Sequence, residues 1–91
     1  MIDVNVRFWG TLRHPAPRHF QVRVSERATV AAALSEVCRQ VGGSEADEME
    51  AELLGTAALL VNGDTIGHRG GLSVPLANGD TLGIVLAMSG G

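Results

Sequence analysis

The spacing of apolar residues between positions 30 and 41 restricts the possible folds most strongly, because it predicts an amphipathic helix. Its apolar residues are spaced three and four apart, which is typical of a helix with one buried face. Thr29 is a suitable N-cap for this helix, and Gly42-Gly43 is a suitable end. The stripe consists of Val30, Ala33, Leu34, Val37, Cys38 and Val41. A single apolar stripe needs another layer to cover it, so we expect a sheet against this face.

Two strands are predicted before this helix. Residues 2–9 alternate between apolar and mostly polar side chains, which is the period of a half-buried strand. A second alternation runs from Phe20 to about Ser25. The connection, residues 10–18, contains Pro15 and Pro17 and is predicted to be a loop. The two strands are expected to form a hairpin.

A short second helix is predicted after Gly43. Ser44 and Asp47 have the spacing of a capping box, and acidic residues suit the first turn of a helix. This helix is expected to end near Leu54, with Met49 and Leu53 facing inward.

The last third of the chain reads as strands joined by turns. Asn62-Gly63, after an apolar run, is typical of a two-residue hairpin turn. The expected segments are strands at 57–61 and 65–66, an irregular stretch at 68–75, a turn at 78–80 and a strand at 81–87. We therefore predict an α+β fold: a mixed sheet of four to five strands, with its terminal strands side by side and one main helix across one face. Residues 1–91 are expected to form a single domain with a flexible Ser-Gly-Gly tail at 89–91.

Composition excludes several classes of function. The 91-residue chain has one cysteine, a net charge of −3, and no run of apolar residues that could span a bilayer. We expect no internal disulfide, no membrane association, no nucleic-acid partner and a cytoplasmic location. The histidines, His14, His19 and His68, lack the spacing to form a metal site with Cys38, so no metal is expected. Cys38 lies on the helical stripe and is expected to be a small buried residue, not a nucleophile.

Charge is unevenly distributed along the chain. Residues 1–27 carry five arginines and only two acidic residues, whereas residues 45–52 carry five acidic residues and no basic one. The two clusters could orient partners, or they could simply be solvated faces. Both interpretations remain open at this stage.

The C-terminus ends in Ser89-Gly90-Gly91 directly after an apolar strand. Glycines without a Cβ form a thin tail that can enter a narrow channel, and the chemical group at its end is a carboxylate. That carboxylate is inert until its oxygen becomes a good leaving group, as adenylation by ATP achieves. A frayed end or a remnant added by cloning is the alternative.

Several motifs resemble those of MoaD/ThiS-type proteins, the molybdopterin synthase small-subunit family of ubiquitin-like sulfur carriers. The matching segments run from end to end in the expected order. They are Val6-Arg7-Phe8-Trp9-Gly10-Thr11-Leu12-Arg13, Thr29-Val30 with Leu34, Val61-Asn62-Gly63, Pro75-Leu76-Ala77-Asn78-Gly79-Asp80, and Ser89-Gly90-Gly91. The chain departs from the common pattern at Trp9-Gly10, where Phe-Ala is more usual, and at Ala87-Met88, where prolines often stand.

The resemblance implies a β-grasp fold and a sulfur carrier without an active site of its own. Gly91 would be adenylated by an ATP-using E1-like adenylyltransferase of the MoeB/ThiF type and converted to a thiocarboxylate. A sulfur-accepting enzyme, of the MoaE type or another, would take the sulfur for cofactor or metabolite biosynthesis, with molybdopterin the best-known case. Ser89, Gly90 and Gly91 would thread the partners' active sites, and the chain would bind no cofactor itself.

Apolar residues near the tail are candidates for partner docking. Leu86 and Met88 are the predicted contacts, although Leu86 could equally be part of the core. Two other functions remain open: a ubiquitin-like modifier conjugated through Gly91 to lysines of target proteins, and a β-grasp interaction subunit whose tail has no role.

Overall fold

The computed structural model describes residues 1–10, 16–68 and 70–86. Within them, no helix is long and apolar enough to cross a membrane. Three short 3₁₀ turns, Gly43–Glu45, Ile66–His68 and Gly71–Ser73, join the main elements. The main elements in chain order are β1 (Ile2–Trp9), β2 (His19–Val24), α1 (Val30–Gly42), α2 (Ala46–Thr56), β3 (Ala58–Val61), β4 (Asp64–Thr65) and β5 (Thr81–Val85).

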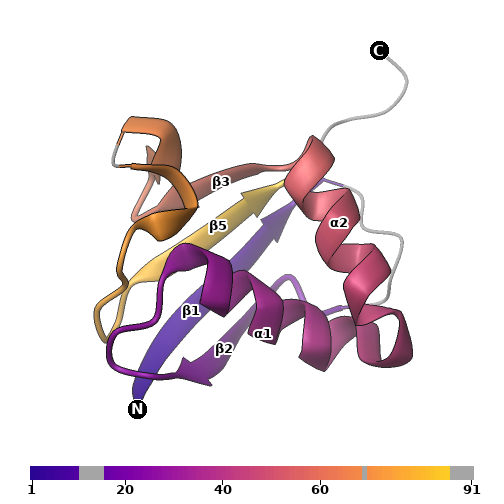
Figure 1. Ribbon diagram of the computed structural model, residues 1–91, viewed down its shortest axis with the longest axis horizontal. Coiled ribbons are helices and arrows are strands. Elements are labelled where there is room, and N and C mark those ends of the chain that lie inside the picture. Colours follow the sequence, from indigo (N-terminus) through magenta and orange to yellow (C-terminus); the bar gives the residue numbers. More distant parts are fainter. Residues whose placement is uncertain (11–15, 69, 87–91) are drawn as a thin grey trace.

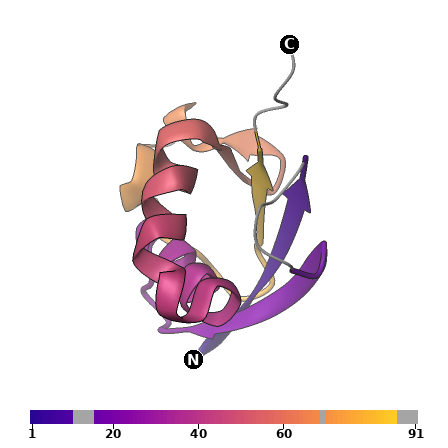
Figure 2. The same cartoon turned by 90° about the vertical axis from the view of Figure 1, so that its right-hand side faces the viewer.

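The strands form one mixed sheet in the order β2-β1-β5-β3-β4. Its central pair, β1 and β5, comes from the two ends of the chain and is parallel, whereas the other neighbours are antiparallel (Figure 1). Both helices lie on one face of the sheet, and neither covers the other face (Figure 2). The predicted α+β architecture, with paired terminal strands and the main helix across one face, is confirmed. We call the face away from the helices the outer face.

The core lies between the helices and the sheet. The even-numbered side chains of β1 face the helices and are at most 9% exposed, as the alternation predicts. The buried side of α1 is the predicted stripe, except that Val41 at its end is only partly buried. Thr29 caps α1 as expected, since its Oγ1 accepts a hydrogen bond from the Ala32 N–H at 3.3 Å. Gly43, with φ of 55°, caps the other end.

The second helix differs from the prediction at its start. The N-cap residue is Glu45 and makes no side-chain capping hydrogen bond, so the capping box of Ser44 and Asp47 is wrong. The reason is that Ser44 lies inside a 3₁₀ turn that directly continues α1, whereas an N-cap residue requires extended backbone. Met49 and Leu53 are fully buried, as expected.

The hairpin at Asn62-Gly63 is confirmed. Both residues have positive φ, 52° and 88°, which suits the turn type that Asn-Gly favours. The following strand, β4, begins one residue earlier than predicted. At the other end, β5 is described as a strand to Val85, and Ala87 lies outside the described residues.

Asp80 joins two turns at the start of β5. Its Oδ2 accepts a hydrogen bond from the Ala77 N–H at 2.8 Å, and its Oδ1 accepts one from the Asn62 side-chain amide at 3.0 Å. Asn62 in turn accepts a hydrogen bond from the Thr81 N–H through its Oδ1 at 2.9 Å. These bonds fix the point where β5 enters the sheet.

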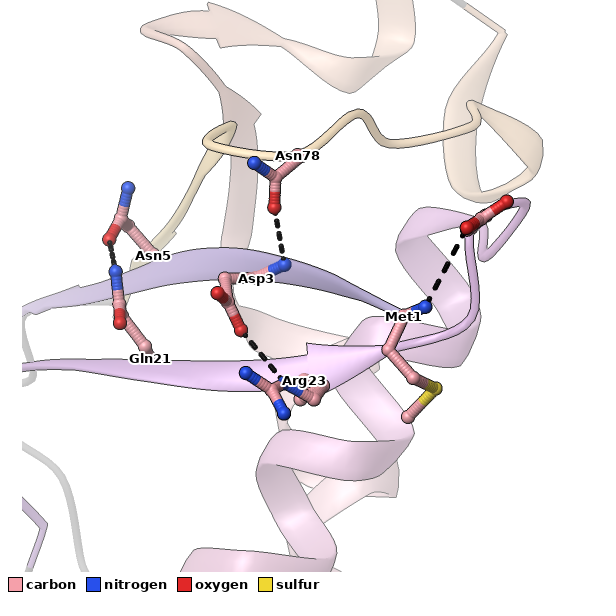
Figure 3. Close-up of polar contacts among 7 residues, drawn as sticks. Met1, Asp3, Asn5, Gln21, Arg23 and Asn78 are labelled. Carbon is pink, nitrogen blue, oxygen red and sulfur yellow. Dashed lines mark hydrogen bonds and ion pairs between the residues drawn. The ribbon is translucent and has the colours of Figure 1, made fainter.

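The turn at 78–80 is also hydrogen-bonded to β1. Asn78 Oδ1 accepts a hydrogen bond from the Asp3 N–H at 2.8 Å (Figure 3). On the outer face, Gln21 donates to Asn5 Oδ1 at 2.8 Å, and Arg23 pairs with Asp3 at 3.2 Å (Figure 3). Polar side chains therefore cover the outer face where β1 begins.

Cys38 is part of the core, as its place in the helical stripe predicts. Its side chain is fully buried. Burial, and to a smaller extent the negative charge of Glu50, raises the pKa of the thiol from its ordinary value of 9.0 to about 11. The thiolate, which is the nucleophilic form, is therefore suppressed at neutral pH.

We expect Asp80→Ala to lower the free energy of unfolding by about 1–3 kcal/mol, because two donors lose a charged acceptor. Urea unfolding measures the change. Arg27→Ala, which removes an exposed side chain in the turn before α1, is the control and should change stability by less than about 0.5 kcal/mol. Equal effects of the two substitutions would contradict the bridging role of Asp80.

We expect stability to fall as the pH rises from 9 to about 11, because the pKa of Cys38 is higher in the folded chain than in the unfolded one. The contribution is fully present below pH 9, and its loss amounts to about 2–3 kcal/mol. The chain has no tyrosine and all seven basic residues are arginines, so Cys38 is the side chain that titrates in this window. Urea unfolding of Cys38→Ala should show no such decline, and a decline of the same size in that variant would refute the assignment.

Candidate functional site

The sequence analysis predicts that the functional group is the carboxylate at the C-terminus. Met88, Ser89, Gly90 and Gly91 lie outside the described residues, so their roles in docking, threading and adenylation stay predictions. Leu86 is the last described residue before them. The geometry of the site is therefore built from the surface around Leu86.

The end of β5 is held against the end of β1. Val85 pairs with Trp9 in the parallel register, and the Leu86 N–H donates a hydrogen bond to the Trp9 carbonyl at 2.7 Å. Both strands point toward the same end of the sheet (Figure 1). The chain thus leaves the middle of the sheet beside the residues that end β1.

Leu86 is 7% exposed and belongs to the buried cluster. Of the two alternatives for this residue, its burial favours the core. A docking role for Leu86 is not tested by burial in the free chain and stays a prediction.

Trp9 lies on the outer face and covers a glycine of the neighbouring strand. A Cβ placed on Gly83 would lie 2.7 Å from Trp9 Cζ3, so the ring occupies the space where a side chain would be. The Arg7 guanidinium lies 5.2 Å from the centre of the indole ring, within the range of a cation–π contact. Trp9 nevertheless remains 43% exposed.

Half-buried apolar side chains extend this surface. Leu60 is the antiparallel partner of Gly83, and its Cβ would lie 3.6 Å from a Cβ on that glycine. Val85 is the partner of Trp9, and both Leu60 and Val85 are half-buried. We call Arg7, Trp9, Leu60 and Val85, arranged around Gly83, the Trp9 patch. It contains a cation and no carboxylate.

Sequence reasoning missed the Trp9 patch. Trp9 occupies the polar parity of its strand, and the sequence marks it only as a departure from Phe-Ala. The available signal was Gly83, because a glycine inside a strand often marks a site where another group approaches closely. Predicting that the Trp9 ring packs over Gly83 requires knowledge of the register between β1 and β5, which cannot be read from the sequence.

The two charge clusters belong to different layers. Arg7 and Arg23 project from β1 and β2 of the sheet, whereas Asp47 and Glu48 lie in the first turn of α2. The arginines differ in their contacts, since Arg23 pairs with Asp3 whereas Arg7 lies over the ring of Trp9. A role in orienting partners stays a prediction for both clusters.

The described part of the chain brings together no group of three histidine, cysteine, aspartate or glutamate side chains that could hold a metal ion. His14 lies in the segment that is not described. Cys38 lies on the buried side of α1 and is not exposed to solvent.

Comparison with solved structures finds the same fold over nearly the whole chain. SAMP1 of Haloferax volcanii is 26% identical, with a TM-score of 0.77 and 98% of this chain and 99% of that chain covered. One chain in the complex of subunits 1 and 2 of the molybdopterin-converting factor of Helicobacter pylori is 24% identical, with a TM-score of 0.59 and coverage of 99% and 100%. Urm1 of Trypanosoma brucei is 19% identical, with a TM-score of 0.62 and coverage of 98% and 95%.

These similarities confirm the ubiquitin-like β-grasp fold. Comparison with curated protein sequences gives no match. The sequence profile of the ThiS family matches residues 6–91, which include the second half of β1, the whole of β5 and both helices. The chain therefore belongs to the ThiS family.

Proposed function

We propose that this protein is a sulfur carrier that is activated at the carboxylate of Gly91. The observation that carries the proposal is the match to the ThiS family, which extends over the β-grasp fold and through Gly91. The position of β5 supports it, because this central strand leads directly to residues 87–91. A rigid domain that presents its end beside an exposed patch suits delivery of that end to another protein.

The chemistry needs two steps. A Gly91 carboxylate oxygen attacks the α-phosphorus of ATP on an E1-like enzyme and releases pyrophosphate. A sulfide sulfur then attacks the acyl carbon, the bond to AMP breaks, and a thiocarboxylate is left. Because sulfur is softer and more nucleophilic than the oxygen it replaces, the thiocarboxylate can pass its sulfur to an acceptor held by a second partner.

The chain's own residues take no part in bond making apart from Gly91. Cys38 is buried and its pKa is raised to about 11, so it does not compete as a sulfur acceptor. The protein is therefore a co-substrate and not an enzyme by itself. The molybdopterin-converting factor of Helicobacter pylori, a complex of two subunits, supports a partner subunit that accepts sulfur for molybdopterin.

The Trp9 patch is the surface on which we expect the activating enzyme to dock. Tryptophan and arginine are the residue types most enriched among those that dominate binding energy at interfaces. The patch lies next to Leu86, so a partner seated on it would lie close to the point from which residues 87–91 continue. Because Arg7 supplies a positive charge and Trp9 an exposed apolar ring, the matching surface is an apolar pocket with a carboxylate at its edge.

The second candidate function is a ubiquitin-like modifier conjugated through Gly91 to lysines. It is favoured by the similarity to SAMP1, the small archaeal modifier protein, and to Urm1. The chain's seven basic residues are all arginines, so such a modifier could not form chains on its own lysines.

We expect intact-protein mass spectrometry to detect the carrier state. The chain is incubated with the E1-like enzyme, ATP and a sulfide donor, and its mass should rise by the difference between sulfur and oxygen. Deletion of Gly91 should abolish the change, whereas the Cys38→Ala variant should still show it. An unchanged mass together with covalent conjugates to other proteins would favour the modifier.

We expect Trp9→Ala to raise the KM for adenylation by about tenfold or more, with kcat within about twofold, because docking is weakened and the tail is intact. Release of pyrophosphate measures the reaction. Leu54→Ala is the matched control, since Leu54 is similarly exposed, at 47%, but lies on α2. Equal KM values for the two variants would exclude the Trp9 patch as the docking surface.

A further inference from the structure

The corner formed by Trp9 and Gly10 holds the last described residue of the chain in place. The Leu86 N–H donates to the Trp9 carbonyl at 2.7 Å, one residue beyond the last strand pair, Trp9 and Val85. The side chain of Leu86 is anchored in the core. The hold on this end of β5 therefore extends one residue past the strand.

Gly10 packs against the backbone of Leu86. A Cβ on Gly10 would lie 2.7 Å from the Leu86 carbonyl oxygen and 3.0 Å from its Cβ. Because the nearest atom belongs to the backbone, a side chain on Gly10 could not be accommodated by a change of rotamer. The φ of 99° at Gly10 adds a separate requirement for glycine.

The corner is braced from the other side by β2 and the residues before it. Arg18 donates from its Nη1 to the Gly10 carbonyl at 2.9 Å. The Arg18 carbonyl in turn accepts a hydrogen bond from the Phe8 N–H at 2.9 Å. These two hydrogen bonds hold the backbone on either side of Trp9, whose carbonyl accepts the Leu86 N–H.

We propose that the Trp9-Gly10 corner is a positioning element that fixes the origin of the reactive tail at Leu86. The proposal rests on the proposed function, in which Gly91 carries the reacting carboxylate. Five residues, 87–91, follow the fixed point. At about 3.3–3.6 Å per extended residue, they reach at most roughly 18 Å. The partner that this geometry fits has its reacting group within that distance of the docked Leu86.

Fixing the position of Leu86 is expected to affect the rate of reaction at Gly91 more than the affinity for the partner. Displacement of a reacting group by about 1 Å can reduce a rate by as much as a hundredfold, even when the altered residue is remote. Gly10 has no side chain in the Trp9 patch, and the atoms nearest to a Cβ added to it all belong to Leu86, so it acts through the backbone of Leu86. Its substitution should therefore lower kcat and leave KM largely unchanged.

The test compares Gly10→Ala with Gly79→Ala in the full chain. Gly79 has nearly the same φ, 89°, but a Cβ there would meet no atom within 4 Å. The pair separates the contact with Leu86 from ordinary backbone strain. Two readouts are measured: hydrogen exchange of the Leu86 amide, with the Val6 amide as a reference for global opening, and adenylation by the E1-like enzyme.

For Gly10→Ala we expect exchange at Leu86 to accelerate at least about tenfold relative to Val6. We also expect kcat to fall at least about tenfold, with KM within about twofold. Gly79→Ala should leave both the relative exchange and kcat near their original values. If exchange at Leu86 is unchanged in Gly10→Ala, the Trp9-Gly10 corner does not hold Leu86 in place, and this conclusion does not depend on the chemistry of Gly91. Faster exchange with an unchanged kcat overturns the positioning role.

A second pair of variants tests whether the length of residues 87–91 matters, and it leaves Trp9 and Gly10 unchanged. Deletion of Ala87 shortens the tail by one residue, whereas Ala87→Gly keeps its length. We expect the deletion to lower kcat at least about tenfold and the substitution to have little effect. Equal kcat values for the two variants overturn the fixed reach. If the original chain is not adenylated at all, the proposed function fails and the positioning role fails with it, while exchange at Leu86 still decides whether the corner holds the strand.

Discussion

The parallel pairing of β1 and β5 is the constraint on which the rest of the structure depends. It joins the two ends of the chain at the centre of the sheet, so that β2 is added beside β1, and β3, followed by β4, is added beside β5. Parallel neighbours cannot be joined by a tight turn, and the intervening chain supplies the helical layer that buries their inner side. Because both strands run in the same direction, the end of β1 and the end of β5 meet at one edge. Leu86, the last residue before 87–91, therefore lies beside the exposed Trp9.

Two glycines adapt this pairing to the proposed role. Gly83 leaves room for the Trp9 ring on the outer face, and Gly10 leaves room for the Leu86 carbonyl at the corner. The contacts differ in kind, since the first involves the end of an exposed side chain and the second involves backbone. An added methyl group at Gly83 could be accommodated by movement of the indole ring, whereas one at Gly10 requires the strand to move. Docking and positioning are thus built from different contacts, although the residues involved are adjacent.

Local sequence patterns predicted the elements but not the contacts between distant segments. The stripe from Val30 to Val41 and the alternation of β1 were sufficient for the helix, the strand and their buried sides, because period and burial are coupled within one element. The capping box at Ser44 failed because the preceding helix continues into a 3₁₀ turn, a feature that the spacing of Ser44 and Asp47 does not contain. The Trp9 patch was missed because its residues come from three strands, and the register between strands is set by the whole sheet. The Gly-Gly end of the sequence predicted the C-terminal carboxylate as the reacting group, and the resemblance to a family added the expectation of a thiocarboxylate.

The proposed chemistry requires no catalytic group from this domain. Once Gly91 is an acyl adenylate, a sulfur nucleophile gives a thiocarboxylate and a lysine amine gives an amide bond. The two fates differ in the nucleophile that reaches the acyl carbon, and neither requires a side chain of this protein to act as acid or base. What the carrier must supply is a docking surface and a fixed distance from that surface to the acyl carbon. The Trp9 patch and the Trp9-Gly10 corner are suited to these two tasks, so the choice between sulfur transfer and conjugation falls to the partner that supplies the nucleophile.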